Sequence, residues 1–305
     1  MASQHHVQMG NPKLLLDFLL QLLPFIDDTL PSTPLMVKIQ HNLDHYLPFR
    51  DHAPQRIKSK GLEGPYHPSV IDTRIGVFAA AFWHGVSYAT KSVIDKTMVF
   101  KLTKFHLREK TLIESIGAKD TEQYFCNPKA YGPYNCFHTT SSSEQYWESS
   151  RRPELTSWLR ENIKPSYLKQ WRFFKGTYLK DSNGKYEKDS KDKKKKAFPQ
   201  IGNLISHVLT ADYACAGKVQ LPSIEDMGEI VAEIDAGGLK GLRALGYLDG
   251  IPKLSKEQTT VALRDTYEYL SANLTDRQKS LMDFGVLLIE HALCKFTRCR
   301  TYNWV

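Results

Sequence analysis

Residues 197–248 read AFPQIGNLISHVLTADYACAGKVQLPSIEDMGEIVAEIDAGGLKGLRALGYL, and this stretch decides the fold class. Its apolar residues recur at intervals of three and four, which predicts amphipathic helices with one buried stripe each. We expect Pro199 in the first turn of one helix, Gly217 at its end and Ser223 as the N-cap of the next. The run 235–238 then breaks the second helix, and leucines at helical spacing begin a third. We expect the rest of the chain to pack around this stretch.

The glycine-rich run after the second helix has two interpretations. It resembles a helix-hairpin-helix nucleic-acid module, in which backbone N–H groups at the start of a helix meet a phosphate. On that interpretation the contacts come from Gly237, Gly238, Lys240 and Arg243. The alternative is a plain helical hairpin whose glycines permit a left-handed turn and close packing. Asp235 favours the hairpin, because its carboxylate would repel a phosphate.

Helical periods continue on both sides of this stretch. They predict helices over residues 12–23, 34–46, 70–93, 153–163, 166–174, 255–270 and 275–296. Ser255 with Gln258, and Thr275 with Gln278, resemble capping boxes at the start of the last two. Residues 97–107 fit a strand or a helix, and 117–145 read as an irregular loop. The sequence therefore predicts an all-α or mainly α fold, an irregular multi-helix globular bundle with long loops, and we find no repeat at a fixed period that would indicate a solenoid.

Length and composition favour a folded globular protein. The chain has 305 residues and 41% hydrophobic content, enough for a substantial core. We expect an N-terminal helical region (1–175), a mobile lysine-rich loop (176–197) and a C-terminal helical region (198–305), or one continuous domain. No apolar run is long enough to cross a bilayer, so we expect no membrane partner. Five cysteines do not suggest a disulfide framework, which favours a cytoplasmic or nuclear setting.

Positive charge is concentrated in one segment. The net charge is +8, and residues 180–196 hold eight lysines against four acidic residues, an excess of +4. Half of the total therefore lies in this segment, where Lys193, Lys194, Lys195 and Lys196 are consecutive. Such a run is typical of a solvated loop or of a site for a polyanion.

The neighbouring segment KQWRFFKGTY, residues 169–178, interleaves aromatic and basic side chains. Aromatic rings stack on bases while cations meet phosphates, so Lys169, Trp171, Arg172 and Lys175 could bind single-stranded nucleic acid. The same sequence pattern is also typical of an amphipathic helix whose aromatic side chains lie in the core and whose cations face solvent. The basic residues Lys295, Arg298 and Arg300 lie in the last turn of the final predicted helix, where the helix dipole alone favours them.

Two sets of residues could bind a metal. His41 and His45 are four apart on the predicted helix 34–46, so both rings could point toward one ion, with His84 as a more distant ligand. Two surface histidines near Tyr46 are the alternative. A structural zinc could also join members of a second set, for which ordinary buried cysteines are the default: Cys126, Cys136, His138, Cys294 and Cys299.

These patterns lead to one main functional hypothesis. We expect an intracellular helical protein that binds a polyanionic partner, with nucleic acid as the expected class, and no required cofactor. The rival hypotheses are a metal-dependent helical enzyme that uses His41 and His45, and an adaptor that works through protein contacts. The sequence leaves open whether the protein is an enzyme, what a substrate would be and which oligomer it forms.

Overall fold

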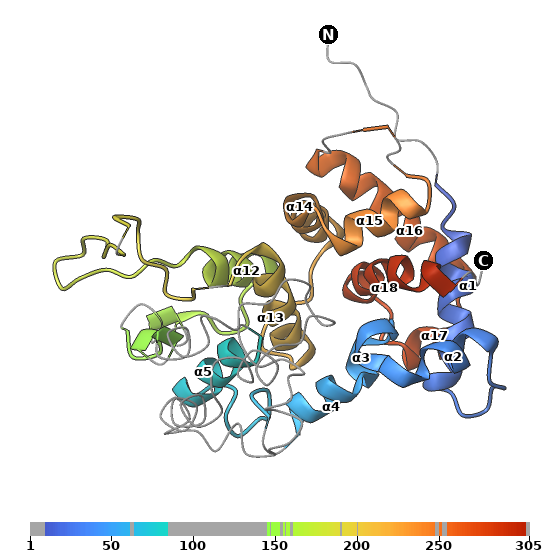
Figure 1. Cartoon of the computed structure of the whole chain (residues 1–305), viewed down its shortest axis with the longest axis horizontal. Coiled ribbons are helices and arrows are strands. Elements are labelled where there is room, and N and C mark those ends of the chain that lie inside the picture. Colours follow the sequence, from blue (N-terminus) through green and yellow to red (C-terminus); the bar gives the residue numbers. More distant parts are fainter. Residues whose placement is uncertain are drawn as a thin grey trace, which may run out of the picture. The chain divides into compact units, whose positions relative to one another are not determined.

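The computed structural model describes residues 10–61, 64–84, 145–146, 148–152, 155, 157–158, 161–189, 191–199, 201–247, 250–251 and 255–302. These residues are mainly helical, which confirms the predicted all-α, multi-helix fold class (Figure 1). In this part of the chain, extended segments pair only through isolated bridges. None of the helices described there is long and apolar enough to span a bilayer.

The described helices have the following bounds in chain order: α1 Lys13–Leu22, η1 Leu23–Phe25, α2 Pro34–Ile39, η2 Gln40–Asn42, α3 Leu43–Tyr46, η3 Arg50–His52, α4 Pro54–Lys60, α5 Arg74–Phe82, α12 Tyr167–Gly176, α13 Asn203–Cys215, α14 Ile224–Ile234, α15 Gly237–Ala244, α16 Lys256–Asn273, α17 Asp276–Leu281, α18 Val286–Cys299 and η6 Arg300–Tyr302. Those marked η are short 3-10 helices. The predicted segments 97–107 and 117–144, and the end of the helix predicted over 70–93, lie outside the described residues.

Contacts group the chain into two units. Unit 1 comprises residues 1–56 and 221–305, and unit 2 comprises residues 57–220. The stretch 197–248 crosses this division, because α13 belongs to unit 2 whereas α14 and α15 belong to unit 1. The contacts therefore divide this stretch between the two units and do not gather the rest of the chain around it as one piece. The partition into 1–175, 176–197 and 198–305 stays a prediction from sequence that these contacts do not follow.

Helix α18 forms the centre of unit 1. Helices α15, α14, α1 and α3 all contact it, and Phe18 of α1 meets Phe296 edge to face with ring centroids 5.7 Å apart. Side chains on almost every side of α18 are buried, and they include two charged residues: Leu287, Leu288, Ile289, Glu290, Ala292, Leu293, Lys295, Phe296 and Cys299. A helix enclosed in this way organises the core of the unit.

Helix α15 approaches α18 through its glycines. A Cβ atom built on Gly241 would lie 2.5 Å from the Cβ atom of Leu293, and one on Gly237 would collide with the Cys294 Sγ atom. The left-handed residue that ends α14 is Asp235, with φ of 47°, and not a glycine. The structure confirms close packing as the role of the glycines and corrects the position of the turn.

The helix predicted over 34–46 is broken into three short pieces. Thr33 caps α2 by accepting a hydrogen bond from the Met36 amide at 3.1 Å. After the 3-10 turn η2, Asn42 caps α3 by accepting from the His45 amide at 3.3 Å. His41 and His45 therefore do not lie on one continuous α-helix, and their spacing of four no longer places both rings on one face.

Both predicted capping boxes are present. The Ser255 hydroxyl accepts from the Gln258 amide while the Gln258 side chain accepts from the Ser255 amide, and Thr275 and Gln278 repeat the arrangement. The helix predicted over 275–296 is interrupted, because Asp283 adopts a φ of 50° and Gly285 precedes α18. Local start signals were thus sufficient to find where helices begin, and insufficient to find where the last one breaks.

Removing one of these caps should have a modest effect. We expect Ser255→Ala or Thr275→Ala to lower the free energy of unfolding by about 1 kcal/mol, because each leaves an amide at a helix start without its acceptor. Ser280→Ala is the matched control, since Ser280 is exposed inside α17. Urea unfolding followed by circular dichroism measures the free energy of unfolding of all three variants. Equal stability of the cap variants and the control would contradict the role of the boxes.

Unit 2 is built on the pair α12 and α13. The Trp171 indole is fully buried and its Nε1 donates to the carbonyl of Asn203 at 3.0 Å. Ser166 caps α12 by accepting from the Lys169 amide, and Gly217 takes the expected left-handed conformation after α13, with φ of 75°. Helix α13 begins at Asn203, so Pro199 lies before it and not in its first turn.

Candidate functional site

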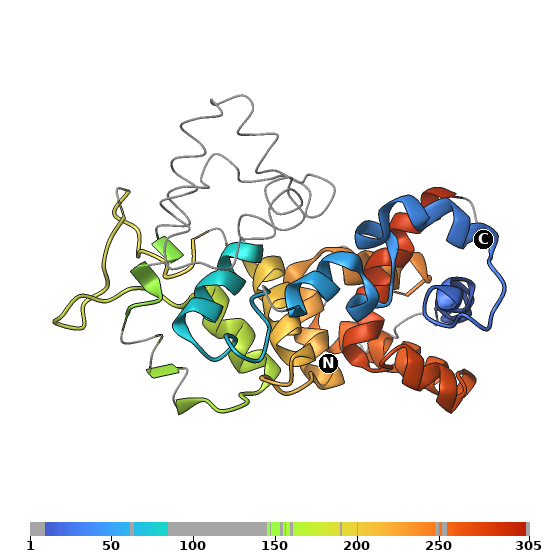
Figure 2. The ribbon, with the colours of Figure 1, turned by 90° about the horizontal axis from the view of Figure 1, so that it is seen from below.

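The segment 177–197, which we call the basic arm, projects from the end of α12 in both views of the ribbon (Figures 1 and 2). Its sequence contains a short repeat, with a period much shorter than that of a solenoid. The letters TYLKDSNG at 177–184 are followed by KYEKDSKD at 185–192, so the pattern Tyr-x-Lys-Asp-Ser recurs after eight residues. A repeat of this length suggests that the two halves form the same local structure.

Each half of the repeat ends in the same turn. The Asp181 Oδ1 atom accepts hydrogen bonds from the amides of Asn183 and Lys185, both at 2.9 Å. The Asp189 Oδ1 atom likewise accepts hydrogen bonds from the amides of Lys191 and Lys193, at 2.8 and 2.9 Å. These amides lower the pKa of the Asp189 carboxyl. Left-handed residues, Gly184 and Asp192, complete the turns.

Three segments of the arm pair with one another. The Leu179 amide donates to the Lys195 carbonyl, the Lys195 amide to the Glu187 carbonyl, and the Glu187 amide to the Leu179 carbonyl, each at 2.9 Å. These three residues are spaced by eight, and the Leu179 side chain is buried. The predicted mobile loop thus has a specific backbone pairing, while its mobility stays a prediction.

The arm presents most of its lysines to solvent. Six are exposed: Lys180, Lys185, Lys188, Lys191, Lys193 and Lys194. The four consecutive lysines are not equivalent, because Lys193 and Lys194 are exposed whereas Lys195 and Lys196 are half-buried. Among the acidic residues, Glu187 contacts Arg152 at 2.8 Å and Lys195 at 3.8 Å, and Asp192 lies 3.3 Å from Lys188.

Two tyrosines of the repeat form the aromatic part of the arm. The rings of Tyr178 and Tyr186 meet edge to face with centroids 6.2 Å apart. The Lys194 Nζ atom lies 4.1 Å from the centre of the Tyr186 ring, and Lys180 approaches the same ring at 5.3 Å. Sequence reasoning missed this cluster, and the eight-residue repeat is the signal that could have found it.

The aromatic side chains of α12 have a different role from the one expected for stacking on bases. Trp171 is 0% exposed, and the Lys175 Nζ atom lies over its ring, 3.5 Å from the ring centroid. Phe173 and Phe174 are also buried. Trp171 therefore belongs to the core of unit 2, which corrects the nucleic-acid interpretation for this residue. Lys169 and Arg172 are exposed on the opposite side of the helix.

The glycine run around α15 packs closely against α18. Gly237 and Gly238 face α18, and a Cβ atom on Gly238 would lie 3.1 Å from the Glu290 Oε1 atom. That carboxylate lies beside the first turn of α15 and would repel a phosphate there. Arg243 donates to the Ile251 carbonyl at 3.2 Å, and Lys240 is exposed. The stretch is therefore scaffold, with Lys240 as its solvent-facing cation.

His41 and His45 lie near the Tyr46 ring, with centroids 5.8 and 4.5 Å away. His41 Nδ1 contacts the Lys38 carbonyl at 2.9 Å, and the Arg298 guanidinium lies 3.5 Å from His45 Nδ1. A guanidinium beside the ring opposes binding of a second cation. Among the described residues no group of three His, Cys, Asp or Glu could hold a metal ion. The metal hypothesis stays a prediction from sequence.

The remaining metal candidates fall in different places. Cys126, Cys136 and His138 lie outside the described residues, and Cys294 and Cys299 are free thiols of α18, the second of them buried. His84 is fully buried in unit 2, where its Nε2 atom lies 2.5 Å from Asp212 Oδ2. Burial of a histidine with a carboxylate satisfies the polar groups of both residues.

The chain was compared with protein-family models, curated proteins and solved structures. It matches none of them.

Proposed function

We propose that this protein binds a polyanion, with nucleic acid as the expected partner, through the basic arm. The observation that carries the proposal is the display of six exposed lysines on one backbone-paired arm. An arm with an excess of +4 over residues 180–196 attracts phosphate groups. Its turn aspartates are held by backbone amides, so they stay at the bases of the turns while the lysine ammonium groups can reach a ligand.

The buried aromatic side chains of α12 determine the kind of recognition that we expect. Stacking on Trp171 would require an exposed ring face, and that residue is 0% exposed. Contacts from lysines to phosphates carry affinity without reading bases. We therefore propose binding that depends little on base sequence and that accepts both single and double strands. A cytoplasmic or nuclear location fits this partner and the three free thiols of the described residues.

Neutralising three exposed lysines of the arm should strongly weaken binding. We expect the triple variant Lys191→Gln, Lys193→Gln, Lys194→Gln to lose affinity for a labelled DNA oligonucleotide by at least about tenfold at low salt. The slope of log affinity against log salt concentration should fall by about 2 for a single strand, because three phosphate contacts disappear. Fluorescence anisotropy at several salt concentrations measures both quantities.

A second triple variant controls for net charge. Lys38→Gln, Lys164→Gln and Lys256→Gln remove the same charge from exposed sites outside the arm and should leave affinity nearly unchanged. Equal losses of affinity in the two triple variants would show that the lysines of the arm contribute no more to binding than other surface lysines. Absence of binding by the unmodified protein at low salt, to single and double strands alike, would end the proposal.

A further inference from the structure

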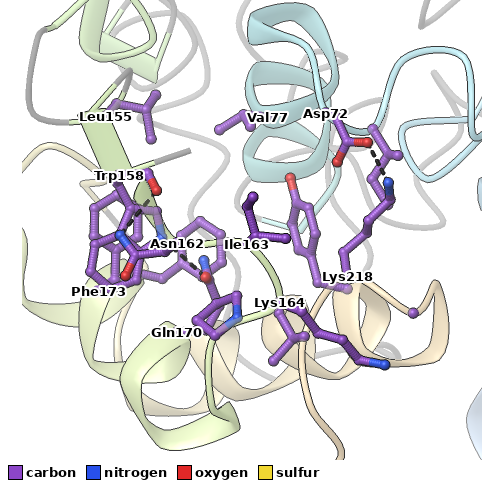
Figure 3. Close-up of a pocket in the computed structure, with 16 residues that line it drawn as sticks. Asp72, Val77, Leu155, Trp158, Asn162, Ile163, Lys164, Gln170, Phe173 and Lys218 are labelled. Atoms are coloured by element: carbon purple, nitrogen blue, oxygen red, sulfur yellow. Dashed lines mark hydrogen bonds and ion pairs between the residues drawn. The ribbon is translucent and has the colours of Figure 1, made fainter. Parts of the chain in front are cut away.

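Unit 2 contains a pocket that is independent of the basic arm. It has a volume of about 390 Å³ and lies between α5, α12, the end of α13 and the segment 155–165. Figure 3 shows Trp158 and Phe173 on one side of it and Asp72 with Lys218 on the other. Pockets that hold small molecules range from about 300 to 1,000 Å³, so the volume is sufficient for one.

One residue that lines this pocket carries a buried hydroxyl with no hydrogen-bond partner among the described residues. Tyr213 lines the pocket and is 6% exposed. Its ring packs against Tyr66 and Phe174, with centroids 5.5 and 5.8 Å away, whereas its hydroxyl finds no partner among the described residues. Leaving a buried polar group unpaired destabilises the folded state, and native proteins rarely do so. A ligand that accepts a hydrogen bond would remove this destabilisation.

The surroundings of Tyr213 select against a charged acceptor. Burial, together with the carboxylates of Asp72 and Asp212, raises the pKa of the Tyr213 hydroxyl well above its usual value. The hydroxyl therefore keeps its proton and acts as a donor. The same carboxylates oppose an anionic group at that point. A cation cannot accept the hydrogen bond, so a neutral carbonyl is the best match.

The opposite wall is aromatic. Trp158 and Phe173 stack with centroids 4.2 Å apart and an angle of 10° between their planes, and the Trp158 Nε1 atom donates to Gln170 Oε1 at 3.1 Å. Leu155 and Val77 add apolar surface, and Ile163 is 90% exposed at the same pocket. Such a wall favours a planar ring.

We infer that this pocket binds a small, uncharged aromatic compound whose carbonyl oxygen accepts a hydrogen bond from the Tyr213 hydroxyl. The aromatic ring lies in the apolar part of the pocket, near Trp158 and Phe173. The exposed ion pair of Asp72 and Lys218 borders the pocket and contributes little to affinity. This binding does not depend on the polyanion proposal, since it uses none of the lysines of the arm.

Four probes of similar size test the inference by chemical-shift titration in NMR: acetophenone, isopropylbenzene, benzoate and benzylammonium. Acetophenone should bind tightest, about fivefold more tightly than isopropylbenzene, because only its carbonyl can accept from Tyr213. In Tyr213→Phe this preference should disappear while isopropylbenzene binds as before. Tyr213→Phe should also be at least as stable as the unmodified protein, because it removes an unpaired hydroxyl.

A second variant tests whether the probes bind in this pocket. Val77→Phe fills the pocket and should abolish binding of both neutral probes, with circular dichroism confirming that the protein is folded. Should it not fold, Leu155→Phe serves the same purpose from the facing segment. Equal binding of acetophenone and isopropylbenzene, tighter binding of benzoate, or no binding of any probe would each overturn the inference. So would a loss of stability in Tyr213→Phe, because it would mean that the hydroxyl already has a partner.

Discussion

Gly241→Val is expected to lower the free energy of unfolding of unit 1 by about 3 kcal/mol, although valine is at least as good a helix former as glycine. The reason is the distance between α15 and α18. A Cβ atom at Gly241 would lie 2.5 Å from the Leu293 Cβ atom and 2.6 Å from the Leu293 carbonyl oxygen. That oxygen belongs to the backbone of the central helix and cannot rotate away. The two helices would have to separate, which opens the core on both sides.

Gly176→Val is the matched control. Gly176 is the last residue of α12, and a Cβ atom there would meet no atom within 4 Å. We expect this variant to change stability by less than about 0.5 kcal/mol. Urea unfolding followed by circular dichroism compares the two substitutions. If Gly241→Val is as stable as Gly176→Val, the close approach of α15 to α18 does not exist.

The helix starts were predictable because their signals are local. Ser223, Ser255 and Thr275 each cap the helix that the sequence assigned to them. A cap needs only a side-chain oxygen and an amide three residues later, so neither depends on tertiary structure. The role of the glycines at 237 and 238 was different. Whether a glycine serves a turn or a close contact depends on what lies opposite, and α18 is about 50 residues away in the sequence.

The candidate interface was predicted in part. Its charge was visible in the sequence, because a run of lysines needs no fold to be recognised. The aromatic side chains of 169–178 could not be assigned, since a helix that buries Trp171 and a helix that exposes it for stacking have the same pattern of letters. The arm's pairing could have been suspected from the repeat of Tyr-x-Lys-Asp-Ser. Nothing in the sequence marks Tyr213, because an unpaired hydroxyl is a property of its surroundings.

Lys295 shows most clearly how the fold changes the meaning of a residue. The sequence placed it at the end of its own helix, where the dipole favours a cation. In the structure its Nζ atom donates to the carbonyls of Asp44 and His45, at 2.7 and 3.0 Å, and so caps a different helix, α3. The side chain is 5% exposed. Burial, and the nearby cations Arg298, Arg56 and Arg50, lower the pKa of Lys295 to about 7.

This lowered pKa makes the stability of unit 1 depend on pH. The unfolded chain holds the lysine proton up to its ordinary pKa of 10.5, whereas the folded chain releases it near 7. The contribution of Lys295 to stability is therefore greatest above pH 10.5 and is lost as the pH falls through 7. Between these values stability should rise by about 1.4 kcal/mol for each pH unit because of this residue.

Lys295→Met isolates the contribution of Lys295 from that of other groups that titrate in the same range. Methionine fills similar space and carries no charge, so the variant should be more stable than the unmodified protein at pH 7 and should lose this advantage as the pH rises. The difference in unfolding free energy between the two proteins, measured by urea unfolding across this range, gives the slope directly. Lys279→Met, at a partly exposed site on α17, is the control for replacing a lysine outside the core of the unit. A flat difference for Lys295→Met would mean that Lys295 stays charged in the folded protein, because only a buried amine that gives up its proton on folding can produce the slope.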